Sequence, residues 1–187
     1  MKKIFLLAMV LALFATGSLL AQVSGGVKAG LNLADLTGDV SDVKMKVGYH
    51  FGGFINLDLT EQLSLQPELL FNAVGASEDG GDGKININYI SVPVMVLYSF
   101  GNVNIQAGPQ IGFLLSAKRK DNGEDEDIKD LFKSTDFGFN LGLGADFGKL
   151  NASARYCIGL SNIGDDEDVE IKNGVFQIAL GLKLFGE

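Results

Sequence analysis

Apolar and polar residues alternate with a period of two along most of this chain. In the stretch LSLQPELLFNAVGA at 63–76, one face is apolar and the other carries hydroxyl, amide and carboxylate groups. The apolar face comprises Leu63, Leu65, Pro67, Leu69 and Phe71, and the opposite face comprises Ser64, Gln66, Glu68, Leu70 and Asn72. Because successive side chains of a strand point to opposite faces of its sheet, this alternation predicts a β-strand with one apolar face.

Segments of this kind recur after residue 22, where no stretch shows the 3.6-residue period of an amphipathic helix. The eight predicted strands are 24–33, 45–59, 63–76, 84–100, 103–117, 134–148, 150–160 and 174–185. Short turns alternate with long polar connections, which lie near 34–44, 77–83, 118–133 and 161–173. An even number of antiparallel strands, with short turns at one end and long loops at the other, is typical of outer-membrane β-barrels.

The sequence therefore predicts an all-β fold, an eight-stranded antiparallel up-and-down transmembrane β-barrel with its apolar face against lipid. The alternative is a soluble antiparallel barrel or sandwich in the periplasm, in which the apolar face is the core. Gly, Asn, Gln and Ser dominate the polar face, whereas a water-facing strand usually carries many Lys, Glu, Thr and Arg residues. This composition favours the membrane barrel, because small and amide side chains fill a narrow interior.

The N-terminal residues have the layout of a cleavable signal peptide, since Lys2 and Lys3 precede a short apolar run. We expect a signal peptide at 1–21 and one outer membrane β-barrel domain at 22–187. The net charge of the whole chain is −8, and removal of two lysines makes it −10. This acidity argues against a nucleic-acid partner. The single cysteine, Cys157, excludes an internal disulfide, and we interpret it as a small buried residue.

Two features interrupt the simple strand pattern. The parity of the segment 84–100 slips near Asn88, which predicts a bulge, or a strand end that stands above the bilayer. Pro67, Pro93 and Pro109 fall inside predicted strands, where each removes a backbone donor from the ladder. We expect local bulges to accommodate these prolines.

Six charged residues fall on the interior face of the predicted barrel, and they are Lys28, Glu68, Arg155, Asp58, Asp146 and Lys183. The first three lie at similar heights, and the other three lie nearer the periplasmic end. An unpaired charge is costly in a narrow, water-poor interior, so these groups should neutralise one another. We hypothesise a Glu68–Arg155 pair with Lys28 nearby, acting as a structural plug.

Several segments resemble the PorT-like outer-membrane β-barrel family, which is eight-stranded and OmpA/OmpX-like in architecture. They are VKAGLNLADL at 27–36, LSLQPELLFNAVGA at 63–76, INYISVPVMVLYSF at 87–100, IQAGPQIGFLLSA at 105–117 and FGFNLGLGADFG at 137–148. The resemblance implies residence in the outer membrane, with no cofactor and no shared catalytic motif. One class of the family's members serves protein secretion, and many members have no assigned task. The chain departs from common barrel endings, because Gly186 and Glu187 follow Phe185.

The candidates for catalysis or metal binding are weak. His50 is the sole histidine, and we expect it to line the barrel rather than act as a base. The acidic stretches 121–130 and 164–170 offer carboxylates for Ca²⁺ or Mg²⁺, but neither has the EF-hand spacing. We interpret them as a solvated rim and predict no metal site, no cofactor and no enzymatic activity.

The expected function is structural or interactive, exercised through the four long outer loops of a monomer with a plugged interior. The expected partners are outer-membrane lipids and an extracellular or envelope protein that contacts the acidic loops. Two alternatives remain open. The first is binding or transport of a small solute or lipid, with a possible secretion role, and the second is a lipid-modifying enzyme.

Overall fold

The computed structural model describes residues 23–38, 43–78, 83–121, 124–164 and 171–186. The predicted signal peptide and residues 165–170 of the second acidic stretch lie outside these ranges. No helix within the described ranges is long and apolar enough to span a membrane. The elements are β1 (Val23–Gly38), β2 (Val43–Asp58), β3 (Leu63–Glu78), β4 (Lys84–Phe100), β5 (Val103–Asp121), β6 (Glu124–Asp127), the 3₁₀ turn η2 (Lys129–Leu131), β7 (Thr135–Phe147), β8 (Leu150–Gly159) and β9 (Ile171–Phe185).

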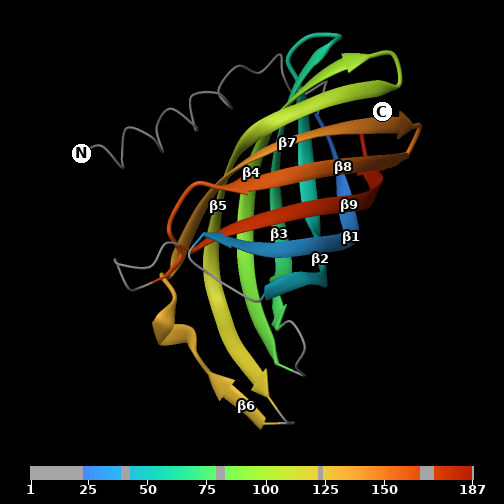
Figure 1. Cartoon of the computed structure of the whole chain (residues 1–187). Coiled ribbons are helices and arrows are strands. Elements are labelled where there is room, and N and C mark those ends of the chain that lie inside the picture. The colour runs from blue at the N-terminus through green and yellow to red at the C-terminus, as the bar shows by residue number, and fades with distance from the viewer. Residues whose placement is uncertain (1–22, 39–42, 79–82, 122–123, 165–170, 187) are drawn as a thin grey trace.

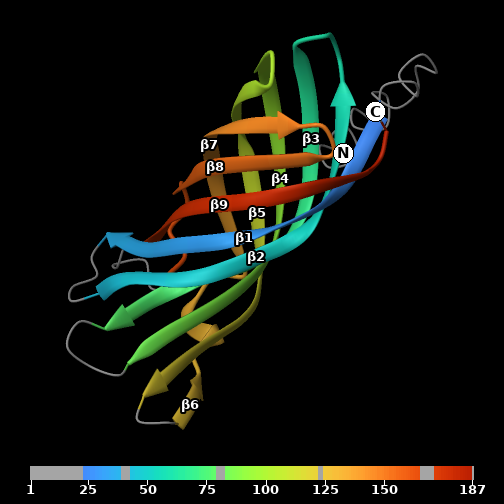
Figure 2. The same ribbon diagram turned by 90° about the vertical axis from the view of Figure 1, so that its right-hand side faces the viewer.

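Eight of these strands close into an antiparallel barrel (Figure 1). The chain runs through β1, β2, β3, β4, β5, β7, β8 and β9, each strand pairs with the next, and β9 pairs with β1. Figure 2 shows the start of β1 beside the end of β9, where Gly25 pairs with Phe185. The predicted fold class is confirmed, and each predicted segment corresponds to one barrel strand.

The alternation of side chains places the apolar face on the outside of the barrel. In β3, Leu69 is 58% exposed, whereas the neighbouring Glu68 is 3% exposed. Large apolar residues are exposed on every barrel strand, for example Val47, Ile105, Leu141 and Leu180. A soluble fold would bury this belt, so the outward apolar surface fits a barrel that faces hydrocarbon.

The strands extend further at the long-loop end than the sequence predicted. The predicted loop at 118–133 is partly wrong, because β5 continues to Asp121 and pairs with the short strand β6. Basic residues on β5 face acidic residues on β6, with Lys118 opposite Asp127 and Lys120 opposite Asp125. Opposite charges across a strand pair stabilise the pairing. The resulting β5–β6 hairpin projects from the end of the barrel opposite the C-terminus (Figure 1).

A register shift occurs near Asn88, as the sequence indicated, but the extra residue belongs to the neighbouring strand. Asn88 pairs with Ser116 and Tyr89 pairs with Leu114, so Leu115 of β5 forms the bulge. The parity of β4 itself is unbroken, since Ile87 and Tyr89 are both buried in the barrel interior. The sequence pattern looks shifted here because the inward-facing residues at this height are apolar.

The expected bulges at the prolines are absent from the described ladders. Across Pro67, the pair Phe54–Glu68 is followed by Leu57–Leu65, so both strands advance equally. The β3–β4 and β4–β5 ladders also keep their registers across all three prolines. A missing N–H removes a hydrogen bond without adding a residue, so the ladder is interrupted and its offset is preserved. The register shifts lie elsewhere, at Gly25/Gly26, Met45/Tyr49 and Asn88/Tyr89.

Candidate functional site

The interior of the barrel is the candidate site, because the inward faces of the strands collect its buried polar groups. These groups are carried by Ser24, Lys28, Asn32, His50, Ser64, Gln66, Glu68, Asn72, Ser91, Asn104, Gln106, Asn140, Ser153, Arg155, Asn173 and Gln177. Buried polar groups are stable only when they have hydrogen-bond partners. Their surroundings differ along the barrel, between three layers and an amide network above the central one.

The central layer is built on Glu68, which receives hydrogen bonds from three strands. Arg155 of β8 binds it with both terminal nitrogens, Nη1 to Oε2 at 2.9 Å and Nη2 to Oε1 at 2.7 Å. Lys28 of β1 donates to Oε1 at 2.9 Å. The side chain of Glu68 is 0% exposed. The structure thus brings Lys28, Glu68 and Arg155 together across the lumen, and the two-pronged arginine contact is the strong form of such a pair.

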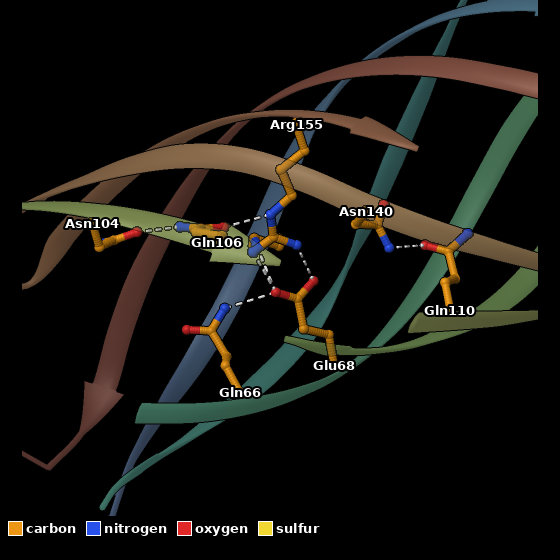
Figure 3. Close-up of polar contacts among 8 residues, drawn as sticks. Gln66, Glu68, Asn104, Gln106, Gln110, Asn140 and Arg155 are labelled. Carbon is orange, nitrogen blue, oxygen red and sulfur yellow. Dashed lines mark hydrogen bonds and ion pairs between the residues drawn. The ribbon is translucent and has the colours of Figure 1, made fainter. Parts of the chain in front are cut away.

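Neutral amides complete this layer (Figure 3). Nε of Arg155 donates to Oε1 of Gln106 at 2.6 Å, and Gln66 donates to Glu68 at 2.7 Å. Gly142 lies opposite Arg155 in the β7–β8 ladder. A Cβ on Gly142 would lie 2.7 Å from Cγ of Arg155 and 2.4 Å from the backbone oxygen of Ala154. Glycine at 142 therefore leaves room for the arginine to cross the barrel.

The second layer is a cavity of about 380 Å³ at the short-turn end, which we call the periplasmic vestibule. The other three predicted charges, Asp58, Asp146 and Lys183, line it. Nζ of Lys183 lies 3.5 Å from Oδ1 of Asp146. Asp58 has no such cation among the described residues, and its Oδ1 accepts from Asn56 and Ser64 at 2.6 Å each. The six predicted interior charges therefore form two groups, one in the central layer and one in the vestibule.

His50 belongs to a neutral amide network above the central layer. Its Nδ1 donates to Oδ1 of Asn32 at 2.7 Å, and Gln177 donates to Asn32 and Asn72 at 3.0 Å. His50 is 2% exposed and its described hydrogen-bond partner is an amide rather than a carboxylate. This environment orients the ring and supplies no acid to form a catalytic dyad.

The third layer, at the outer end, is an apolar cluster that was not predicted from the sequence. Its buried cluster comprises Ala34, Val74, Ile87, Tyr89, Leu114, Ala117, Ile128, Cys157 and Val175. Ile128 comes from the loop between β6 and η2, and its backbone nitrogen donates to the oxygen of Ala117 at 3.0 Å. The inward parity of Ile87 and Val175 was a usable signal, but Ile128 lies in a segment without periodicity. Cys157 is buried here, as predicted.

The arrangement combines charge neutrality with full occupation of the central layer. Lys28, Arg155 and Lys183 balance Glu68, Asp58 and Asp146, so the six interior groups sum to zero formal charge. Within the described residues, no group of three or more His, Cys, Asp or Glu side chains is placed to hold a metal ion. The interior side chains therefore bind one another across the lumen and fill its central layer.

Comparisons with known proteins agree with this architecture. The family model described as "Outer membrane protein beta-barrel domain" matches residues 19–165. One similar solved structure is Ail, the attachment invasion locus protein of Yersinia pestis, in complex with the heparin analogue sucrose octasulfate. It is 16% identical, the match covers 87% of this chain and 99% of Ail, and the TM-score is 0.55. Neisserial surface protein A is 15% identical over the same shares, also with a TM-score of 0.55.

No curated protein sequence matches the chain. The identities to the solved structures are low, so these structures support the fold alone, and the family assignment rests on the family model. That model covers most of the chain and describes a domain of the outer membrane. The chain therefore belongs to the outer membrane protein β-barrel domain family, and the protein is an outer-membrane β-barrel.

Proposed function

We propose that this protein is a closed outer-membrane scaffold that presents its outer loops to another envelope or extracellular protein. The main support for a closed interior is the Arg155–Glu68 contact, which joins β8 to β3 across the lumen. Lys28 adds a link to β1. Opening a path through this layer requires the separation of buried, hydrogen-bonded charges, which is costly.

The outer apolar layer supports the same proposal from the opposite end. Ile128 packs among strand residues inside the barrel, and Phe132 packs against the same cluster. The loop residue Phe132 also forms a β-bridge with Gly164. These contacts draw the loops across the mouth of the barrel, and they leave the β5–β6 hairpin as the element that projects furthest (Figure 1).

The hairpin is the proposed interaction element. It exposes basic residues on β5, such as Lys118 and Lys120, beside acidic residues on β6, such as Asp125 and Glu126. Ail was solved with a sulfated heparin analogue. For this chain we propose a protein partner instead, because its projecting surface mixes both charges and the chain as a whole is acidic. Mixed charges favour orientation-specific protein contacts.

We also propose that the chain falls within the PorT-like group of outer-membrane barrels. The segments 63–76 and 87–100 support this assignment, and the structure places them side by side as β3 and β4. A secretion-related role would follow from that membership. It remains compatible with a closed barrel that acts through protein contacts.

Planar-bilayer recording tests the closed interior. The refolded protein should show no steady conductance, whereas a general porin in the same bilayers should conduct. Replacement of 120–125 by a short Gly-Ser turn tests whether the hairpin is separable from the folded barrel, as an interaction element should be. The barrel should keep its heat-modifiable gel mobility, because the hairpin lies beyond the closed strands. Steady conductance steps in the wild-type protein would contradict the proposal.

A further inference from the structure

The periplasmic vestibule carries hydrogen-bond acceptors that no described residue satisfies. Gln66 is 8% exposed, and its amide nitrogen is used by Glu68. Its Oε1 points away from Glu68, toward the Asn104 side of the lumen (Figure 3). Within the described residues, neither this oxygen nor the second carboxylate oxygen of Asp58 accepts a hydrogen bond. Oδ1 of Asn56 is buried and also lacks a partner in the described part of the chain.

The three groups line one cavity, and each of them can accept a hydrogen bond from a ligand. Each is an oxygen that accepts hydrogen bonds, so the complementary ligand is rich in N–H or O–H donors. Oδ1 of Asn56 is buried without a donor in the described part of the chain, and a bound donor would recover the free energy that this costs. Gln66 is held in place for such a ligand, because the amide nitrogen of its side chain is bound to Glu68 of the central layer.

The charges that line the vestibule favour a ligand with a positive charge. Asp58, Glu61 and Asp146 line it with a single cation, Lys183, which leaves a formal charge of −2. Lys183 already lies 3.5 Å from Asp146, so the carboxylate of Asp58 remains without a cation among the described residues. An ammonium group supplies both a positive charge and three donors.

We propose that the periplasmic vestibule binds an organic primary ammonium group, with Asp58 as its counter-charge and Asn56 and Gln66 as amide acceptors. The cavity of about 380 Å³ has room for the ammonium together with its alkyl chain. Two sources supply this chemistry on the periplasmic side of the membrane. One is a soluble polyamine, and the other is the free amino group of a cell-wall peptide. The site lies at the opposite end from the proposed interaction hairpin and does not depend on it.

A titration of the complete refolded barrel with 1,5-diaminopentane tests the site directly. The side-chain amide resonances of Asn56 and Gln66 should shift and saturate. Asp58→Asn should weaken binding by about tenfold, because a charged acceptor becomes a neutral one. Lys183→Gln should strengthen it by removing a competing cation. Glu126→Gln removes the same charge from the exposed β6 strand and should leave the affinity unchanged.

Two further arms separate the possible sources and the alternative ligand. Binding to purified sacculi that is lost after N-acetylation of their amino groups and in Asp58→Asn would identify the cell wall. Saturable diamine binding without sacculus binding would identify a soluble amine. Heat-modifiable mobility confirms that each variant is folded. The proposal is overturned if the amide resonances do not move, if Asp58→Asn and Glu126→Gln bind equally well, or if Ca²⁺ alone occupies the site.

Discussion

Two layers of the lumen are filled by opposite kinds of chemistry. In the central layer, Glu68 is held by Arg155 and Lys28 through contacts of 2.7–2.9 Å. Toward the outside, Ile128 and the apolar residues of the strands form a buried apolar cluster, and Asp136 and Asn173 line a small cavity beside it. Both fillings occupy the same closed barrel, and the inward parity of β4 continues from one into the other.

Residues that face the interior of this barrel are therefore not always polar. A buried ion network fixes particular partners, because each group left unpaired is costly. An apolar cluster tolerates exchange among side chains of similar volume. We therefore expect substitutions in the charged layer to produce the larger losses of stability. Because the chain has no tryptophan, unfolding is best followed by gel mobility and circular dichroism.

The largest effect should come from Glu68→Gln. The substitution removes the only anion of the central layer and leaves Lys28 and Arg155 as neighbouring buried cations. We expect the free energy of unfolding in detergent to fall by about 3–5 kcal/mol. Arg155→Met should cost less, about 2–3 kcal/mol, because Lys28 still neutralises Glu68. Wild-type melting of both variants would refute the paired layer.

The next effect should come from the apolar end. Ile128→Ala removes most of a side chain that is 9% exposed within the outer cluster. We expect a loss of about 2 kcal/mol, at the lower end for such truncations, because a loop residue can partly collapse into the space. Denaturant titration measures the loss. Leu131→Ala is the control, since Leu131 lies in the same loop and is 63% exposed. Equal losses in the two variants would argue against the packing of Ile128 in the outer cluster.

The comparison also shows what the sequence could predict. Strand parity and distance from the strand ends placed Lys28, Glu68 and Arg155 at one height on one face, and the structure brings them together. The same reasoning placed Asp58 nearer the periplasmic end and expected charged groups to neutralise it, although neutral donors hold its carboxylate in the vestibule. Height along a strand is readable from spacing, but the choice between a cation and a nearby amide depends on strand tilt and side-chain reach.

The outer layer escaped prediction for a different reason. Ile87 and Leu114 are apolar, so composition alone does not distinguish them from lipid-facing residues of the same strands. Their partner Ile128 lies in a loop, and a loop has no periodic pattern from which the burial of one side chain in the barrel could be predicted. The bulge at Leu115 shifts the parity of β5 by one residue and obscures the signal further.

A smaller effect should come from the glycine beside the arginine. Gly142→Ala places a methyl group against Ala154 and Arg155, and we expect a loss of about 1–2 kcal/mol from overpacking. Gly53→Ala is the matched control, because its nearest contact would be the oxygen of Gly26 at 3.5 Å. Thermal melting of the two variants in one detergent measures the difference. A tolerated Gly142→Ala would mean that the arginine has more room than its contacts indicate.

The smallest effect should come from the ion pair of the projecting hairpin. Lys120 and Asp125 lie 3.9 Å apart, and both side chains are more than half exposed. Water screens such a pair, so Asp125→Asn should change the free energy of unfolding by less than about 0.5 kcal/mol. Circular dichroism melts at low and high salt measure the change, with Asp125→Glu, which keeps the charge, as the control. A loss that matched Ile128→Ala would show that the hairpin supports the barrel, and its role as a separate interaction element would then fail.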